Sequence, residues 1–184
     1  MSLEFTFQPF LSDEKLAIRP ITVDDLEPMY AIMSDKNIWA GHPASDRYQR
    51  PVFEQWFKNA IASKATIVVS DRATGALIGS SRYYTVATVP DDISIGFTFL
   101  TCAYWGGETN CQLKRLMFDY AFQFFDTIWL HASPDNIRSQ KACEKIGAQF
   151  THDEVSPISG KDELWFCYKV SKEQWQSLKQ PASA

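Results

Sequence analysis

The order of apolar and polar residues divides the chain into alternating strand and helix signals. Apolar and polar side chains alternate over 16–21, which predicts a strand that ends near Pro20. Thr22 has the chemistry of a helix N-cap and acidic residues crowd the following turn, so residues 23–34 are predicted to form a helix. A second helix is predicted to begin near Pro51, after a polar and aromatic loop.

The middle of the chain carries three strand signals. Two β-rich runs over 66–70 and 76–85 are joined by the turn sequence DRATG, which predicts an antiparallel hairpin. The third run, ISIGFTFL over 93–100, contains Gly96. A glycine inside a strand indicates a bulge or the close approach of another backbone or a ligand.

The strongest periodic signal follows the sequence YWGGETN. Apolar residues fall at three- and four-residue steps from Leu113 to Phe125, which predicts a long amphipathic helix lying on a sheet. TIWLHAS then predicts a short buried strand, a short helix is predicted to stop at Gly147, and KDELWFCYKV predicts a final strand before a terminal helix. Helices scattered among strands indicate an α/β (α+β) fold with a mixed sheet that is covered on both faces.

Length and charge narrow the class of protein. A chain of 184 residues with 45% hydrophobic content fits one domain over 1–184, with frayed ends at 1–12 and 180–184. The net charge of −4 argues against a broad nucleic-acid or anionic-membrane surface, and no apolar run approaches membrane-spanning length. We therefore expect a cytoplasmic protein without nucleic-acid or membrane partners, whose substrate is neutral or cationic.

The four cysteines are widely spaced along the chain and form no C-x-x-C pair, and the histidines do not cluster in sequence. This spacing suggests neither a zinc site nor a disulfide framework. The sequence therefore predicts no metal, with the cysteines as small core residues in a reducing compartment.

The stretch YWGGETN has two readings. Two adjacent glycines ahead of a helix can cradle a phosphate, because bare backbone N–H groups approach the ligand without a Cβ in the way. The same pair also suits a tight strand-to-helix corner. The turn alone does not decide between these two readings.

Longer stretches on both sides of the turn carry a family resemblance. ISIGFTFL, YWGGETNCQLKRLMFDYAF and then NIRSQKACEKIGAQF together resemble the acetyl-CoA-binding half of the GNAT N-acetyltransferase superfamily. The early stretch IRPITVDDLE is similar to its ribosomal-protein N-terminal acetyltransferase-like branch. The resemblance implies a mostly antiparallel sheet in which one strand splays from its neighbour. It also implies that the pantetheine arm lies in the gap and that the pyrophosphate rests on the N-terminus of the next helix.

Matched by position, the resemblance implies three groups of acetyl-CoA-binding residues. The splayed strand would pair with the pantetheine amides, and the glycine turn would hold the diphosphate. The asparagine segment would approach pantetheine, the thioester sulfur and the nucleotide phosphates. The implied residues, in that order, are Phe97, Thr98, Phe99 and Leu100, then Trp105, Gly106, Gly107, Glu108, Thr109 and Asn110, then Asn136, Arg138, Ser139 and Lys141. The asparagine also suits a helix N-cap, and both roles can hold together.

The chain departs from the family pattern at four positions. Many members have glutamine or arginine, glycine, glutamate and tyrosine where this chain has, respectively, Ala103, Glu108, Ser94 and Cys143. A carboxylate at a diphosphate site is repulsive, so the Glu108 side chain is expected to point outward or toward the helix start. Its backbone N–H can still serve the phosphate.

Two residues are candidates for proton transfer. The resemblance implies Ser139 as the acid for the departing thiolate, and the plainer alternative is an ordinary residue of the first helical turn. Asp92 lies two residues before Ser94 on the same strand face and is the nearest carboxylate for the amine proton; the plainer alternative is a solvated turn acid. His131 reads as a core or groove histidine that could also act as a base.

The acceptor amine is expected to meet aromatic and hydrogen-bonding residues from the first half of the chain. The predicted substrate contacts are Trp39, His42, Arg82 and Tyr83, with Arg47, Tyr48 and Tyr84 near them. The loop that holds the first two has the composition of a lid, and ordinary packing of aromatic residues under a loop is an equal alternative.

These inferences combine into an acetyl-CoA-dependent N-acetyltransferase, with acetyl-CoA as co-substrate. A primary amine, on a small molecule or a protein N-terminus, would attack the thioester directly in a ternary complex, which needs no Ser-His-Asp set. A homodimer is compatible with this reading. The alternative is a CoA-binding sensor or interaction module with little or no catalysis, which the four departures from the family pattern favour.

Overall fold

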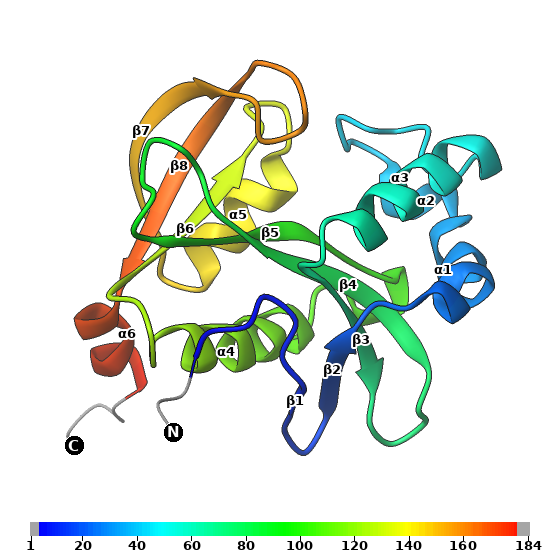
Figure 1. The fold of residues 1–184 in the computed structure, drawn as a ribbon, viewed down its shortest axis with the longest axis horizontal. Coiled ribbons are helices and arrows are strands. Elements are labelled where there is room, and N and C mark those ends of the chain that lie inside the picture. Colours follow the sequence, from blue (N-terminus) through cyan, green and yellow to red (C-terminus); the bar gives the residue numbers. More distant parts are fainter. Residues whose placement is uncertain (1–3, 180–184) are drawn as a thin grey trace. The chain divides into compact units, whose positions relative to one another are not determined.

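The sheet of the protein combines antiparallel and parallel strand pairs. Its strands are β1 (Leu11–Ser12), β2 (Leu16–Pro20), β3 (Thr66–Asp71), β4 (Leu77–Tyr84), β5 (Ile93–Leu100), β6 (Thr127–Ala132), β7 (Gln149–Ser156) and β8 (Glu163–Ser171). They follow the order β1-β2-β3-β4-β5-β6-β8-β7, and β5 pairs with β6 in parallel (Figure 1). The pairs β1–β2, β2–β3, β3–β4, β6–β8 and β7–β8 are antiparallel. This mixed, mostly antiparallel sheet with helices confirms the predicted fold class.

The computed structural model describes residues 4–179, so parts of the predicted frayed ends, 1–3 and 180–184, lie outside the described chain. The helices are α1 (Leu26–Met33), α2 (Lys36–Trp39), α3 (Arg50–Ala62), α4 (Thr109–Ala121), α5 (Ile137–Lys145) and α6 (Lys172–Lys179), with short 3-10 helices η1 (Val23–Asp25) and η2 (Cys102–Tyr104). The helices predicted from Pro51, after YWGGETN and before Gly147 are confirmed as α3, α4 and α5.

Contacts along the chain define two compact units. The N-terminal unit comprises 6–83 and 96–116, and the C-terminal unit comprises the described residues 4–5, 84–95 and 117–179. Strands β4 and β5 and helix α4 each contribute residues to both units. The organisation as a single domain therefore stays a prediction.

The core of the N-terminal unit forms where its helices pack together and onto the sheet. Its buried members are Ile21, Met29, Met33, Ile38, Trp39, Phe53, Phe57, Ala60 and Val68. Helix α2 lies inside the segment that the sequence predicts as a loop. The Asp35 side chain accepts a hydrogen bond from the Asn37 N–H at 2.9 Å, and this cap begins the short helix.

The segment IRPITVDDLE is held by an ion pair between β2 and η1. Arg19 donates two hydrogen bonds to the two carboxylate oxygens of Asp25, at 2.7 and 2.8 Å. The backbone N–H of Thr22 donates a third, at 2.8 Å, which satisfies one of the unpaired donors at the helix start. Asp25 is 4% exposed, so this bidentate pair fixes the angle at which the chain turns from strand to helix.

Replacing Asp25 with asparagine is expected to destabilise the protein by about 1–3 kcal/mol, because Arg19 loses its charged partner beside the core. Burial alone would raise the pKa of Asp25, but the hydrogen bonds from Arg19 and Thr22 more than offset it and hold the pKa below its usual value. A lowered folded-state pKa gives stability that is present above the unfolded pKa of about 4 and is lost as the pH falls through the folded value.

Urea unfolding from neutral pH down to about pH 3 measures this contribution. The wild type should lose more stability on acidification than Asp25→Asn does. The exposed neighbour Asp24 gives the matched control, since Asp24→Asn should unfold as the wild type does. Equal acid sensitivity in wild type and Asp25→Asn would contradict the role of the ion pair.

The C-terminal unit places two kinds of side chain on the two faces of its strands. In the β6–β8 pair, Ile128 lies opposite Val170 and Leu130 opposite Tyr168, and all four are buried. Because side chains alternate along a strand, the residues between them point to the other face. That second face is more polar, and its cross-strand pairs include His131 with Cys167.

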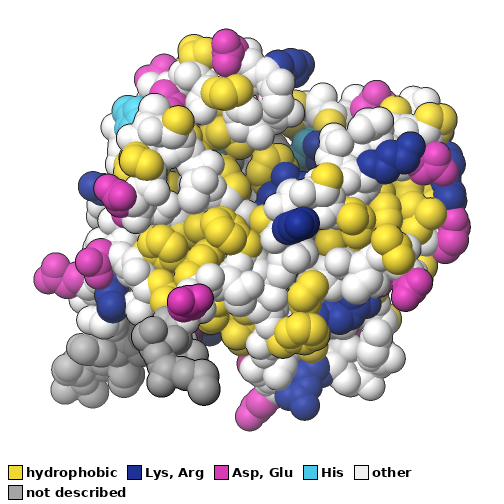
Figure 2. Space-filling model, viewed as in Figure 1, with side chains coloured by type: hydrophobic (Ala, Val, Ile, Leu, Met, Phe, Trp, Pro, Cys, Tyr) yellow, Lys and Arg dark blue, Asp and Glu magenta, His cyan; other side chains and the backbone are white. Residues whose placement is uncertain are grey.

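The surface of the molecule mixes both signs of charge. Figure 2 shows Lys and Arg side chains lying among Asp and Glu side chains on the face in view. This mixture agrees with the small net charge of −4. Among the described residues, no helix combines the length and the apolar character that crossing a membrane requires.

Candidate functional site

Strand β5 has a residue with a positive φ at its middle. Phe97 has a φ of 51°, a left-handed conformation that a non-glycine residue adopts at a cost of about 1–3 kcal/mol. The sequence places the irregularity at Gly96, and the structure puts the positive φ one residue later. The carbonyl of Gly96 accepts a hydrogen bond from the Ser81 hydroxyl at 3.3 Å. This left-handed residue is the first of the four residues predicted to pair with pantetheine.

The other end of β5 departs from β6 early. Their parallel register runs from Ile93, opposite Ile128, to Ser94, opposite Trp129. Among the described residues, only these two residue pairs are in register along a strand of eight residues, as expected for two strands that splay apart. Ser94 is 1% exposed, and its hydroxyl has no hydrogen-bond partner among the described residues.

The glycine turn is open to solvent and leads into a helix. Gly106 has a φ of 73°, and a Cβ added at Gly106 or Gly107 would meet no heavy atom within 4 Å. The carbonyl of Glu108 accepts the hydrogen bond of the Gln112 N–H at 2.9 Å, so α4 begins there and its first N–H groups have no partner within the helix. Glu108 is exposed. This environment suits an anion, because unpaired donors coincide with the positive end of the helix dipole.

Trp105 connects the turn to the end of β5. Its indole Nε1–H donates a hydrogen bond to the carbonyl of Leu100 at 2.8 Å. That carbonyl therefore already has a partner within the chain. Pairing of the Leu100 carbonyl with pantetheine would compete with the indole of Trp105.

A buried lysine that the sequence analysis did not single out lies beside β5. Lys114 is 6% exposed and donates a hydrogen bond to the Thr98 hydroxyl at 2.7 Å. The Thr98 hydroxyl is in turn 2.7 Å from the Ser81 hydroxyl. Helical periodicity places Lys114 on the apolar side of α4, where lysine is rare. This unusual position is the sequence feature that could have identified Lys114.

The predicted asparagine segment forms the start of α5. The Asn136 side chain accepts a hydrogen bond from the Ser139 N–H at 3.1 Å, which confirms Asn136 as a helix N-cap. Arg138 and Lys141 are exposed, and Ser139 is half-buried. Cys143, which replaces the tyrosine of many family members, is 6% exposed and belongs to the core.

Asp92 is anchored by an indole. Its Oδ2 accepts a hydrogen bond from Trp129 Nε1 at 2.9 Å, and the carboxylate is half-buried. Asp92 is therefore a positioned carboxylate rather than a fully solvated turn acid. Asp92 directly precedes β5, and Trp129 lies opposite Ser94 where β5 and β6 pair.

The predicted acceptor residues separate into buried and accessible ones. Trp39 is 1% exposed and Tyr83 is fully buried, so both follow the packing alternative rather than lining an exposed mouth. His42 lies edge-on to the Trp39 ring, with centroids 5.5 Å apart. Arg82 lies over the ring of Phe97, 4.5 Å from its centroid. Among the predicted contacts, His42 and Arg82 are the two that can still meet a substrate.

Three side chains of the C-terminal unit could hold a metal ion. His131, Glu154 and Cys167 each offer a ligand atom, and the three atoms lie within 4.8 Å of one another. His131 Nδ1 is 2.8 Å from the Tyr84 hydroxyl. Sequence spacing could not predict this set, because strand register alone brings the residues together.

The pKa values of His131 and Cys167 limit the acid–base chemistry that this cluster can perform without a metal. Burial, with a smaller effect from His152, lowers the pKa of His131 to about 4. Burial also raises the pKa of Cys167 to about 12, aided by the negative charges of Glu154 and Asp153. At neutral pH the pair is a neutral imidazole and a thiol. His131 is therefore a weak base for an ammonium proton.

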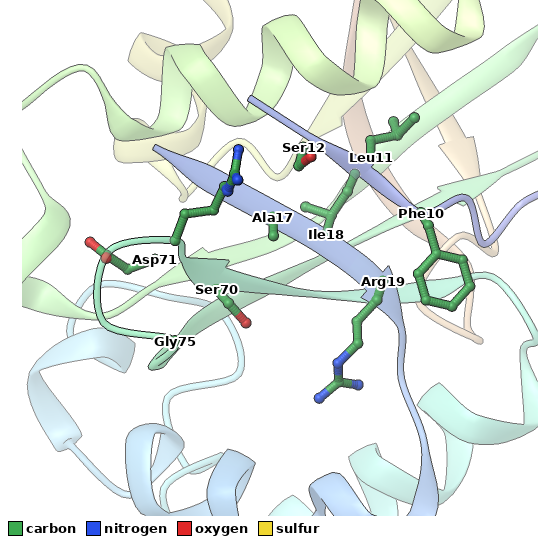
Figure 3. A pocket seen from close by; sticks show the side chains of 10 residues that line it. Phe10, Leu11, Ser12, Ala17, Ile18, Arg19, Ser70, Asp71 and Gly75 are labelled. Carbon is green, nitrogen blue, oxygen red and sulfur yellow. The ribbon is translucent and has the colours of Figure 1, made fainter. Parts of the chain in front are cut away.

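A separate hollow lies on the edge of the N-terminal unit. It has a volume of about 490 Å³ and lies along β1, β2 and the turn after β3 (Figure 3). The residues that line it are Phe10, Leu11, Ser12, Ala17, Ile18, Arg19, Ser70, Asp71, Arg72 and Gly75. None of the predicted site residues belongs to this set, so it is not part of the candidate site.

A strand with a left-handed residue, a glycine turn and the helix start that follows it are the features at which the sequence predicts the acetyl-CoA site. The model of the acetyltransferase (GNAT) domain family matches residues 15–149. The chain belongs to the GNAT acetyltransferase family.

Solved structures of similar fold agree with this assignment. A GCN5-related N-acetyltransferase from Brucella melitensis is 18% identical with a TM-score of 0.78, over 96% of this chain and 86% of that one. A structure described as a putative ribosomal-protein-serine acetyltransferase from Vibrio cholerae is 16% identical with a TM-score of 0.71, over 91% of this chain and 99% of that one. A spermidine N-acetyltransferase from Vibrio cholerae, in complex with CoA and spermine, is 18% identical with a TM-score of 0.61, over 89% of this chain and 99% of that one.

Proposed function

We propose that this protein transfers the acetyl group of acetyl-CoA to a primary amine by direct attack in a ternary complex. The observation that carries the proposal is the open glycine turn at the start of α4, where Gly106 adopts a positive φ and the space around Gly106 and Gly107 is unobstructed. The family match supports the same chemistry. The spermidine N-acetyltransferase among the similar structures was solved with CoA and an amine.

Acetyl-CoA would be held by main-chain groups in the N-terminal unit. Phe97 to Phe99 of β5 would pair with pantetheine, and the turn from Trp105 to Asn110 would hold the diphosphate. The exposed Glu108 would contribute its N–H while its carboxylate stays in solvent. When bound, acetyl-CoA supplies an activated thioester, and a backbone N–H would polarise its carbonyl.

In the proposed reaction the amine nitrogen bonds to the carbonyl carbon, and the carbon–sulfur bond breaks. The departing thiolate gains a proton and the nitrogen loses one, so atoms and charge balance. We assign the first proton to the hydroxyl of Ser139 and the second to Asp92, acting through water. The hydrogen bond from Trp129 to Asp92 supports this assignment, because it orients the carboxylate.

Acetyl-CoA titration combined with thiol release over a panel of amines and peptides tests this function. We expect binding in the micromolar range and thiol release that depends on the amine. Binding without release over the whole panel would favour the CoA-binding sensor. No binding would contradict both functions.

Two substitutions at the start of α5 separate binding from turnover. Asn136→Ala should weaken acetyl-CoA binding about fivefold, because the loop that meets the cofactor loses its cap. Ser139→Ala should lower kcat about 100-fold or more while binding changes little. The exposed Ser177 on α6 gives the control, and Ser177→Ala should match the wild type. If both variants lost the same amount of stability, while the acetyl-CoA affinity and the kcat of the folded molecules were unchanged, Asn136 and Ser139 would be structural residues rather than site residues.

A further inference from the structure

Two arginines of the N-terminal unit lie against aromatic rings in positions where their charges repel each other. Arg47 lies 5.4 Å from the centroid of the Trp39 ring, and Arg82 lies 4.5 Å from that of Phe97. We call these two residues the arginine pair. The Trp39 ring also packs against Phe99 of the same strand as Phe97, with centroids 5.6 Å apart.

Arg47 is a cation without a hydrogen-bonded partner. It is half-buried, and its guanidinium donates no hydrogen bond to the described residues, whereas its backbone N–H donates one to the carbonyl of Ala44 at 3.5 Å. Burial first, and then the charge of Arg82, lower the pKa of Arg47 to about 10, and Asp46 offsets part of this. The guanidinium therefore stays protonated at neutral pH, with five N–H donors and only a ring face and an exposed carboxylate to compensate its charge.

The groups around the arginine pair add donors. Arg82 uses its Nε–H on the Thr66 hydroxyl, at 3.0 Å, which fixes the direction of its guanidinium. His42 accepts the Ala44 N–H at Nδ1, at 2.9 Å, so the proton of its neutral ring is on Nε2. Donors and positive charge beside apolar rings form an environment that favours an oxyanion.

We propose that the arginine pair binds a carboxylate carried by the acceptor, so that the preferred substrate is an amine that also bears a carboxylate, as in an amino acid or a peptide. This inference rests on the proposed function for the identity of the acceptor. Arg82 stacks on Phe97, the first residue of the predicted pantetheine strand, which brings the anion site beside the reacting end of the cofactor. The diphosphate of the cofactor already has a separate predicted site in the turn from Trp105 to Asn110.

The positive charge of the arginine pair favours a different substrate from the one that the net charge of the chain suggests. A net charge of −4 suggests a neutral or cationic substrate. The arginine pair, by contrast, would repel a polyamine, whose charges are all positive, and attract the carboxylate of a zwitterionic acceptor. Selectivity between these two classes of amine would thus come from residues outside the proton-transfer groups.

The first arm of the test measures binding without turnover. N-acetylglycine and N-acetylglycinamide differ only in whether the carboxylate is present, and calorimetry compares their binding to wild type and to Arg47→Gln. We expect the carboxylate to bind wild type about tenfold or more tightly than the amide, and this preference to vanish in Arg47→Gln. Equal binding of the two probes to wild type would overturn the proposal.

The second arm measures kcat/KM for β-alanine against β-alaninamide, and for a dipeptide with a free against an amidated C-terminus. The free carboxylate should be preferred by wild type about tenfold, and Arg47→Gln or Arg82→Gln should abolish the preference. Arg47→Lys should retain part of it, because a lysine keeps the charge and loses the planar fork. Weakened acetyl-CoA binding with an unchanged carboxylate preference would assign the arginines to a cofactor phosphate and overturn the proposal.

Arg50 provides the matched control. It also lies over a ring, 4.6 Å from the centroid of Tyr30, but its charge is paired with Glu27 and Glu54. Arg50→Gln should leave the carboxylate preference unchanged, and an equal loss there would overturn a specific role for Arg47. If no amine is acetylated but carboxylate binding still depends on Arg47, the proposed function fails while the anion site stands.

Discussion

Trp39→Ala is expected to destabilise the protein by about 3–5 kcal/mol, the cost of removing a large aromatic side chain from a packed core. Trp39 is 1% exposed, and its indole Nε1–H donates a hydrogen bond to the carbonyl of Met33 at 2.7 Å. The alanine would leave a cavity and an unpaired carbonyl at the end of α1. Urea unfolding should show the loss as a lower midpoint with the same slope.

Trp105→Ala is the control for this measurement. Trp105 is 39% exposed, so its removal should change stability by less than about 1 kcal/mol. If Trp39 were instead a mobile lid over the acceptor, its alanine variant would fold normally and lose only activity. That outcome would contradict the buried position of Trp39.

Gly79→Ala should cost about 3 kcal/mol, because an added Cβ would collide with backbone. A Cβ at Gly79 would lie 2.1 Å from the carbonyl oxygen of Phe99 and 2.9 Å from a methyl group of Leu100. The strand β5 cannot give way without displacing the residues that are predicted to pair with pantetheine. Thermal unfolding should show a clear decrease in Tm, and acetyl-CoA titration should show weaker binding by the folded fraction.

Gly107→Ala separates this effect from a general cost of losing a glycine. A Cβ at Gly107 meets no heavy atom within 4 Å, and the residue has no positive φ, so stability should stay within about 0.5 kcal/mol of wild type. An unchanged Tm in Gly79→Ala would mean that β4 and β5 do not approach each other as described.

Local sequence patterns predicted most of the elements, since alternation and helical periodicity are properties of contiguous residues. The hairpin of β3 and β4 and the helix α4 are examples. Gly96 indicated a bulge or the close approach of another backbone or a ligand, whereas the structure puts the positive φ at Phe97. Hydrogen bonds from a neighbouring strand, such as that of Ser81, contribute to this choice, and they are not visible in a single strand.

The site was predictable only in part for the same reason. The glycine turn and the Asn136 cap are local signals, and both were found. The set of His131, Glu154 and Cys167 depends on cross-strand register, which no spacing in the sequence shows. Trp39 was ambiguous because an aromatic residue in a polar segment can either cover a site or fill a core, and only the three-dimensional packing decides.

The position of Trp105 gives the turn an optical property of its own. Of six tryptophans, all within the described chain, it alone is exposed, and it lies in the turn predicted to hold the diphosphate. Indole emission depends on solvent contact, so a ligand that covers this residue would shift the fluorescence of the intact protein. The chain therefore carries an internal reporter at the point where the cofactor is expected to bind.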